Sequence, residues 1–282
     1  MIGKMLSKVY GILYRNLLGT GISKYKKIRE IHSYFDSKIQ KEVTTIEGIK
    51  FLGIVENIVE VHVTNIPEIE FCKREIKKGD TIIDAGANIG YFTLFFSKLV
   101  GEEGKVIAFE PDPINFDILK KNIELNKITN VELVKKGISN KNESMKLYKS
   151  KVSGGHSLVK NEWGKEYTEI QTVTLDDYFK DQKIDLIKID VEGFELEAIE
   201  GSKKLFKNNK NIKIITEFGG YYYKNNNNQK KMYPRLLHES GFNLFGIIDK
   251  SKGKSKIIPM GFDKLMEFYS KTDSFILNLI WK

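Results

Sequence analysis

The sequence predicts a doubly wound α/β domain with a mostly parallel, seven-stranded sheet and helices on both faces. From about residue 80 onward, apolar strand-like runs alternate with helix-like runs, which is the pattern of βαβ units. Runs such as "LIKI" and "IKII" are continuously apolar, as expected for strands covered on both faces. The 282 residues, 41% hydrophobic and 29% charged, have the composition of a globular protein and the length to bury a large core.

The elements are predicted in a regular order. Strands are expected at 81–86, 105–110, 131–139, 184–190, 212–218, 243–249 and 274–281. Helices are expected over 91–100 and 113–126, and again after the fourth and fifth strands. Gly101 closes the first helix, and Pro113 starts the second, where its missing N–H is tolerated.

Two regions interrupt the alternation. Residues 140–183 form an insertion in which strand-like "SMKLYKS" and "TEIQTVT" flank "GGHSL", and residues 40–66 resemble a small β element. We therefore predict an N-terminal extension over 1–39 and a single domain over 40–282, whose cofactor core covers about 67–249.

The N-terminal segment is basic and amphipathic. Residues 1–29 carry seven basic and no acidic side chains, so they account for seven of the nine net positive charges. No uninterrupted apolar run approaches the roughly 18 residues of a membrane span, and no signal-peptide pattern is present. Two interpretations stay open: a helix lying on an anionic membrane surface, or a helix docked on the main domain. We expect a cytoplasmic protein; the membrane alternative would add peripheral contact at the inner membrane face through residues 1–29, and the docked helix is slightly favoured.

Cysteine and histidine usage excludes several kinds of site. Cys72 is the single cysteine, which rules out an intrachain disulfide framework and a cysteine-cluster zinc site and suits a reducing compartment. We interpret it as a buried or half-buried helix residue. The four histidines form no H-x-x-x-H pair, which disfavours a zinc site.

The clearest motif is "DAGANIG", which contains Asp84, Gly86, Asn88 and Gly90 and lies between a strand and a helix. Small residues let the backbone pass close to a ligand, and the helix N-terminus offers free N–H groups. Glu110 ends the next strand, 20 residues after Gly90, where a carboxylate binds the ribose of an adenosine cofactor. The nicotinamide fingerprint G-x-G-x-x-G fails at two of its three glycines, and no phosphate-binding G-x-x-x-x-G-K-[ST] loop is present.

The chain resembles the FkbM family of methyltransferases over about residues 67–249. The resemblance rests on "DAGANIG", "FEP", "VTLDDYF", "KIDVEGFE" and "ITEF", in that order. It implies a Rossmann-like class I methyltransferase fold, S-adenosylmethionine as methyl donor, and O-methylation of a hydroxyl on a sugar, glycan, glycolipid or natural product. It also implies that "DVEG" forms the reaction side. The implied cofactor contacts are Asp84, Gly86, Asn88, Gly90 and Glu110, to which we add Ser139 after the third strand.

The acids after the fourth strand are the candidate catalytic groups. An alcohol is a poor nucleophile, so a positioned base or a metal ion would assist its methylation. On a helix expected to start near Val191, Asp190 could instead cap the helix and Glu192 could interact with its dipole. Gly193 favours the functional interpretation, because a residue without a side chain lets a ligand approach. Asp190 and Glu192 are therefore candidates for general base or divalent-metal ligand, and the choice stays open.

Other residues are expected near the acceptor. Glu195 lies about one turn into the expected helix, and Glu217 nearly ends the fifth strand. Tyr221, in "GGYYY", could stack on a sugar ring or only cover the end of the sheet. His156, in "GGHSL", is either a second candidate base or a histidine of a surface loop.

The sequence is also compatible with two other functions. A tRNA or rRNA methyltransferase would use the basic N-terminal arm on phosphates, but "DVEG" occupies the place of the Asn/Asp-Pro-Pro-aromatic turn common in base methylation, which disfavours nucleic acid. A non-catalytic binding module is disfavoured by the intact set of acids. The acceptor, the metal requirement and the oligomeric state are left open by the sequence.

Overall fold

A computed structural model describes residues 41–44, 48–53, 66–149, 157–158, 166–219, 227–249, 256–271 and 276–282. The chain divides into two compact units, residues 1–59 and 60–282. The first unit contains an antiparallel pair formed by β1 (Lys41–Thr44) and β2 (Lys50–Gly53), within the predicted β element. The expected N-terminal helix, His156 and Tyr221 all lie outside the described residues.

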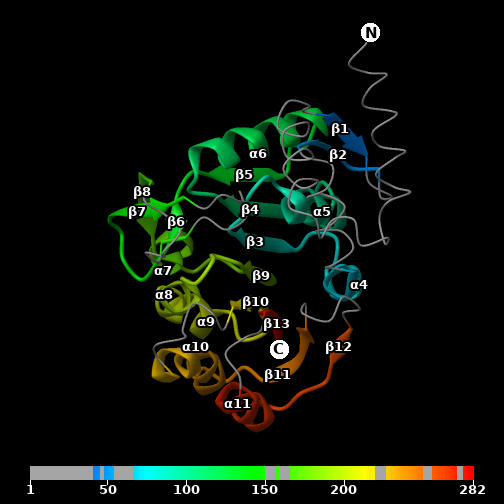
Figure 1. Ribbon diagram of the computed structural model, residues 1–282. Helices are drawn as coiled ribbons and strands as arrows, with labels where there is room; N and C mark the ends of the chain where they lie inside the picture. The colour runs from blue at the N-terminus through cyan, green and yellow to red at the C-terminus, as the bar shows by residue number, and fades with distance from the viewer. Residues whose placement is uncertain are drawn as a thin grey trace, which may run out of the picture. The chain divides into compact units, whose positions relative to one another are not determined.

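A mostly parallel sheet forms the centre of the second unit (Figure 1). Its strands run in the spatial order β12-β11-β13-β10-β9-β3-β4-β5. Their bounds are β3 (Thr81–Ala85), β4 (Lys105–Phe109), β5 (Val131–Val134), β9 (Leu186–Ile189), β10 (Lys213–Gly219), β11 (Leu244–Asp249), β12 (Ile257–Ile258) and β13 (Ile276–Trp281). Strand β13 is antiparallel to both of its neighbours, β10 and β11. From β10 to β5, each strand is parallel to the next one in the sheet. The predicted α/β class and all seven predicted strand regions are present.

Two details of the predicted sheet were wrong. The sheet has an eighth strand, β12, which contains two residues and is too short to give an apolar period. The strand predicted over 131–139 is divided: β5 ends at Val134, and β6 (Gly137–Ile138) pairs with a different sheet.

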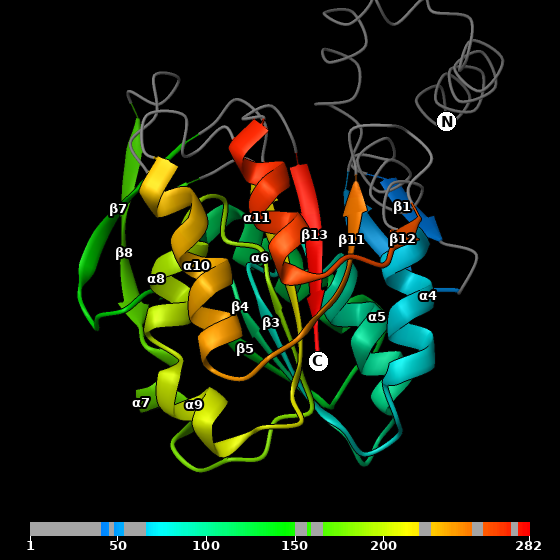
Figure 2. The same cartoon turned by 90° about the horizontal axis from the view of Figure 1, so that it is seen from below.

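Helices cover both faces of the sheet. Figure 2 shows α4 and α5 on one side of the strands and α8, α9 and α10 on the other. The bounds are α4 (Ile66–Glu75), α5 (Tyr91–Val100), α6 (Pro113–Leu125), α7 (Leu175–Phe179), α8 (Glu195–Glu200), α9 (Lys203–Asn208), α10 (Asn227–Glu239) and α11 (Phe262–Lys271). Asp112 caps α6 by accepting the N–H groups of Ile114 and Asn115. Cys72 is buried in α4, as predicted. Within the described segments, no helix has the length and apolar character to cross a membrane.

The insertion forms a small sheet together with β6. Strands β7 (Ser144–Tyr148) and β8 (Tyr167–Val173) match the two strands predicted around "GGHSL", and they pair antiparallel. Strand β6 pairs parallel with β8, so the order in this sheet is β6-β8-β7.

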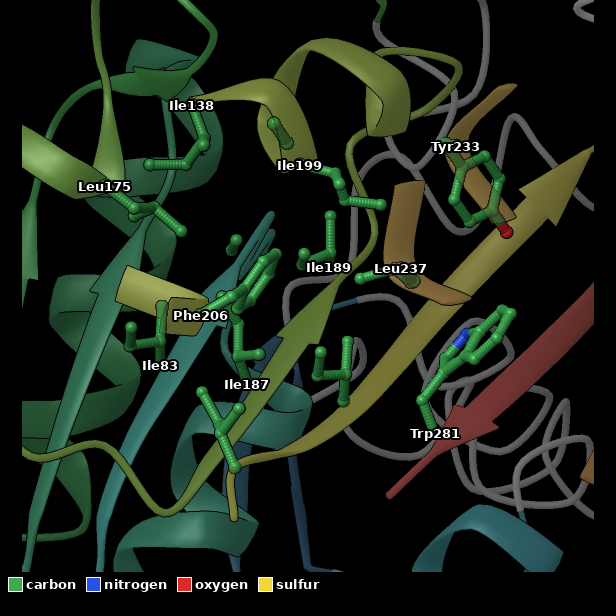
Figure 3. Close-up of a cluster of buried hydrophobic side chains, with 14 of the residues drawn as sticks. Ile83, Ile138, Leu175, Ile187, Ile189, Ile199, Phe206, Tyr233, Leu237 and Trp281 are labelled. Atoms are coloured by element: carbon green, nitrogen blue, oxygen red, sulfur yellow. The ribbon is translucent and has the colours of Figure 1, made fainter. Parts of the chain in front are cut away.

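The main hydrophobic core lies between the sheet and the helices that follow β9. Figure 3 shows Ile187 and Ile189 of β9 within this cluster, together with Phe206 of α9 and Leu237 of α10. Each of these four side chains is buried. Because residues alternate across a strand, Lys188 projects to the opposite face, toward α4 and α5. The core therefore fixes which residues of β9 reach which face.

Candidate active site

The glycine loop joins β3 to α5 and is held by backbone hydrogen bonds. The N–H groups of Gly86 and Ala87 both donate to the carbonyl of Phe109, at 3.0 and 2.9 Å. Gly86 has a φ of 90°, and a Cβ atom at this position would lie 1.9 Å from the carbonyl oxygen of Asp190. Only glycine therefore permits the loop to pack this closely against the end of β9.

Asp84 lies beneath this loop and is fully enclosed. Its side chain is 1% exposed, and Oδ2 accepts a hydrogen bond from Thr93 Oγ1 at 2.6 Å. Burial raises the pKa of Asp84 to about 6, although Lys188 and Thr93 act in the opposite direction. The carboxyl group therefore joins β3 to the first turn of α5 and supports the loop from below.

Glu110 connects the glycine loop to the loop after β4. Its Oε2 accepts the N–H of Asn88 and its Oε1 accepts the N–H of Asp112, each at 2.8 Å. Burial raises the pKa of Glu110 to about 7, against the effect of these two N–H donors. Asn88 itself has a φ of 51°, and its buried Oδ1 has no hydrogen-bond partner. Gly90 follows at the N-cap of α5 with a φ of 96°.

The turn after β9 has a different geometry from the predicted one. We expected a helix from near Val191, but α8 begins at Glu195. Glu192 and Gly193 have φ values of 53° and 93°, in the left-handed region, so the chain cannot be helical there. The alternative roles considered for Asp190 as helix cap and Glu192 as first-turn acid are therefore wrong. The N-cap residue is Phe194, and no side chain caps the helix.

Glu195 holds this turn in place. Its side chain is 1% exposed, and Oε1 accepts the N–H groups of Gly193 at 3.1 Å and Val191 at 3.3 Å. The other oxygen, Oε2, is buried and has no hydrogen-bond partner. Burial, together with the negative charges of Glu217 and Asp190, raises the pKa of Glu195 to about 8.

Lys188 is a buried cation that the sequence places two residues before Asp190. It is 3% exposed, its Nζ lies 2.6 Å from Asp190 Oδ2, and it lies 4.7 Å from the ring centre of Phe92. Burial by itself lowers the pKa of Lys188, but the charges of Asp190, Glu68 and Asp84 outweigh burial and raise the pKa above its usual range. This ion pair orients Asp190.

Three acids meet at the carboxyl edge of β9 and β10. Strand pairing sets Thr216 beside Ile189, so Glu217 and Asp190 follow at neighbouring positions. Asp190, Glu192 and Glu217 each offer a carboxylate oxygen, and these oxygens lie within 4.8 Å of one another. All three side chains are half-buried. The structure thus brings together two acids predicted for the reaction and one predicted for the acceptor.

The insertion reaches the same turn through Ser157. Its Oγ donates to the backbone carbonyl of Glu192 at 2.5 Å, and its backbone pairs with Tyr148 in both directions, at 2.8 and 3.1 Å. Sequence reasoning missed Ser157, although it singled out His156 directly before it. A contact between residues 35 positions apart leaves no periodic signal, and the glycines of "GGHSL" were the only pointer to this loop.

Ser139 lies at the end of β6. Its N–H donates to the carbonyl of Val173 at 3.1 Å, and its hydroxyl donates weakly to Asn140 Oδ1 at 3.4 Å. Its carbonyl oxygen packs against Gly201, where a Cβ atom would be only 2.2 Å away. These contacts place Ser139 between the insertion sheet and the end of α8, and its role at the cofactor stays a prediction.

Comparison with known proteins gives a family match that includes the glycine loop and the turn after β9. The model of the methyltransferase FkbM domain matches residues 84–244, which is more than half of the chain. The methyltransferase sdnD of Sordaria araneosa is 32% identical over 154 residues, covering 43% of this chain and 59% of that protein. The chain thus aligns with less than two thirds of the length of this relative.

Two further similarities are more distant. The hexuronic acid methyltransferase AglP of Haloferax volcanii is 26% identical over 188 residues, covering 65% of this chain and 71% of that protein. The crystal structure of methyltransferase FkbM from Methylobacillus flagellatus KT is 16% identical with a TM-score of 0.43, covering 79% of this chain and 52% of that one.

Proposed function

The chain belongs to the FkbM family of methyltransferase domains, and on that premise we propose that it transfers a methyl group from S-adenosylmethionine to a hydroxyl. The acceptor we propose is a sugar, glycan, glycolipid or related natural product. The observation that carries the proposal is the family match over residues 84–244. This range contains both the glycine loop and residues 190–194, the turn after β9, which we call the acid turn. The name of the hexuronic acid methyltransferase relative supports a sugar acceptor.

We assign the cofactor to the loop after β3. Gly86 and Gly90 let the backbone approach it, and Glu110 accepts the N–H of Asn88 and so shapes the loop. The buried Oδ1 of Asn88, which has no partner, fits a cofactor that carries amino and hydroxyl donors. Asp84 supports the loop through Thr93. The cofactor supplies an activated methyl group on a positively charged sulfur.

We assign the acceptor to the turn after β9. Methyl transfer is an in-line displacement, so the chain's main task is to hold the attacking oxygen in line with the methyl group. Asp190 and Glu192 are the candidates to take the hydroxyl proton, and His156 is a further candidate base. Glu195, Glu217 and Tyr221 are proposed to orient the acceptor. Lys188 and Ser157 act through Asp190 and Glu192 as positioning residues.

The acceptor class is tested by labelled methyl transfer into a cell extract. The extract is incubated with the enzyme and labelled S-adenosylmethionine, then separated into glycolipid, polysaccharide and RNA. We expect label in the glycolipid or polysaccharide fraction with the wild-type chain and none with Asp190→Asn. Label in RNA alone would favour the RNA methyltransferase alternative and overturn the proposal.

We propose that residues 1–39 are an extension of a domain over 40–282, and that residues 1–29 contact a membrane surface. The seven basic side chains of 1–29 support binding to anionic lipid. Flotation with anionic liposomes compares the full chain with a variant lacking residues 1–39. Equal flotation of both proteins would leave the docked helix as the explanation of the amphipathic pattern.

A further inference from the structure

We propose that Asp190, Glu192 and Glu217 bind a hard divalent cation, of the class of Mg²⁺, Mn²⁺ or Ca²⁺, between the ends of β9 and β10. The inference deepens the proposed function and rests on it for the ion's role, because an ion there would hold the acceptor hydroxyl. Binding of the ion, however, is measured without any acceptor.

The spacing of the three acids matches the size of such an ion. Their ligand atoms all lie within 4.8 Å of one another. Opposite oxygens in a coordination shell are separated by about 4 Å around Mg²⁺ and by about 5 Å around Ca²⁺. The limit of 4.8 Å lies within the shell of Ca²⁺, and the oxygens would move slightly closer together around Mg²⁺. They come from adjacent parallel strands and the turn between β9 and α8, so the fold fixes their relative positions.

The ligand chemistry selects the class of ion. All members of the group are carboxylates, and hard cations prefer oxygen ligands, whereas zinc sites are built mainly from cysteine sulfur and histidine nitrogen. Lys188 bonds to Asp190 from the α5 side of the sheet, where it also lies over the ring of Phe92. That buried contact fixes one ligand before any ion binds.

A second observation points to an ion at this place. Glu195 is 1% exposed, and its Oε1 is bound to the two N–H groups that flank Glu192. Its Oε2 is buried without a hydrogen-bond partner, and the charges acting on this carboxyl group include those of Glu217 and Asp190. A buried carboxyl oxygen without a hydrogen-bond partner is unfavourable, and a cation bound by the neighbouring carboxylates would satisfy it. The ion accounts for an oxygen that the described contacts leave unsatisfied.

The ion would act on the acceptor hydroxyl during transfer. A divalent cation lowers the pKa of an oxygen that it contacts. The O–CH₃ bond then forms as the S–CH₃ bond breaks, the electron pair of that bond stays on sulfur, and the hydroxyl proton leaves to a carboxylate or to solvent. The proposed ion site lies next to the glycine loop, because the carbonyl of Asp190 packs against Gly86.

The test is a Mn²⁺ titration of the full chain, followed by electron paramagnetic resonance, with Mg²⁺ and Ca²⁺ as competitors. Wild type, Glu192→Gln and Glu217→Gln are compared with the control Glu124→Gln, which changes an exposed acid on α6. Thermal unfolding of each protein confirms that it is folded. We expect one saturable site per chain in wild type and control, and affinity at least about tenfold weaker in both site variants.

Two results would overturn the inference: no saturable binding at millimolar Mn²⁺, or equal binding in Glu217→Gln and wild type. Binding of S-adenosylmethionine is measured on the same samples. Mn²⁺ binding without methyl transfer to any hydroxyl would remove the proposed function and leave the ion site standing. Methyl transfer to a hydroxyl without Mn²⁺ binding would remove the ion site and leave the proposed function standing.

Discussion

The glycine loop and the acid turn both combine carboxyl side chains with residues in the left-handed region, but their carboxyl groups differ in burial and in what they contact. The glycine loop follows β3 and the acid turn, residues 190–194, follows β9; these strands are neighbours, paired at Ala85 and Ile189. In the glycine loop, Asp84 and Glu110 are buried and bonded to the protein itself. In the acid turn, the carboxylates are half-buried and lie close to a third acid from β10.

We propose that this difference separates a structural role of the buried acids from a catalytic role of the half-buried ones. Carboxylates that accept internal N–H and O–H groups fix a backbone, whereas half-exposed carboxylates at a strand end can meet a substrate. The two turns touch where Gly86 packs against the carbonyl of Asp190. A change confined to one turn should therefore separate binding of S-adenosylmethionine from turnover.

The largest effect is expected from Asp190→Asn. This change preserves the shape of the side chain and removes its charge, so methyl transfer should fall by about 10²–10⁴-fold. Binding of S-adenosylmethionine, measured by calorimetry, should stay close to wild type, because Gly86 packs against the backbone carbonyl of Asp190, which the change leaves in place. Asp117→Asn, on the exposed surface of α6, is the control. Full turnover in Asp190→Asn would remove its role as base or ligand.

Gly86→Ala is expected to have a smaller effect, and to weaken binding of S-adenosylmethionine rather than to act directly on methyl transfer. Gly79→Ala is the matched control, because Gly79 also has a positive φ, of 85°, but a Cβ atom there meets nothing within 4 Å. The control should lose about 1 kcal/mol of stability from backbone strain alone. Gly86→Ala should lose about 1–3 kcal/mol more from the clash with Asp190. It should also bind S-adenosylmethionine at least about tenfold more weakly, equivalent to about 1.4 kcal/mol. Equal behaviour of the two variants would contradict the close packing of the turns.

How much the sequence could predict also differs between the two turns. The glycine loop follows a continuous apolar strand and keeps a fixed spacing to Glu110, so local pattern located every residue in it. In the acid turn, the left-handed φ of Glu192 delays the helix to Glu195, and a non-glycine residue gives no sign of that conformation.

Contacts between distant segments could not be predicted either. The proximity of Glu217 to Asp190 depends on β9 and β10 being neighbours. The bond between Ser157 and Glu192 depends on how the insertion folds back. Hydrophobic periodicity reports which face of an element is buried but not which element lies opposite, so strands were predicted better than the site.

The buried state of Glu110 predicts a pH dependence of stability. Its pKa is raised from 4.5 to about 7 in the folded chain, so the folded state holds the proton more tightly than the unfolded state. The stability due to this group is fully present below the unfolded pKa and is lost as pH rises through about 7. Denaturant unfolding of wild type and Glu110→Gln at several pH values measures it. The wild-type curve should fall relative to the variant across this window, and parallel curves would contradict the burial.

The smallest effect is expected from Ser157→Ala. Loss of one hydrogen bond to the carbonyl of Glu192, worth about 1 kcal/mol, should lower kcat by about fivefold. The KM for S-adenosylmethionine should not change, because the glycine loop is untouched. Ser144→Ala, at an exposed position of β7, is the control. A change in KM with kcat unaltered would show that the insertion acts on the cofactor side instead.

The central claim is that this FkbM methyltransferase domain places a methyl group on oxygen. The most direct measurement supplies isotopically labelled methyl on S-adenosylmethionine to the enzyme and cell extract, and identifies the labelled product by NMR. The account predicts a methoxy carbon on a carbohydrate or natural product, absent when Asp190→Asn replaces the wild type. A labelled methyl on nitrogen or on a nucleic-acid base, still formed by Asp190→Asn, would contradict it.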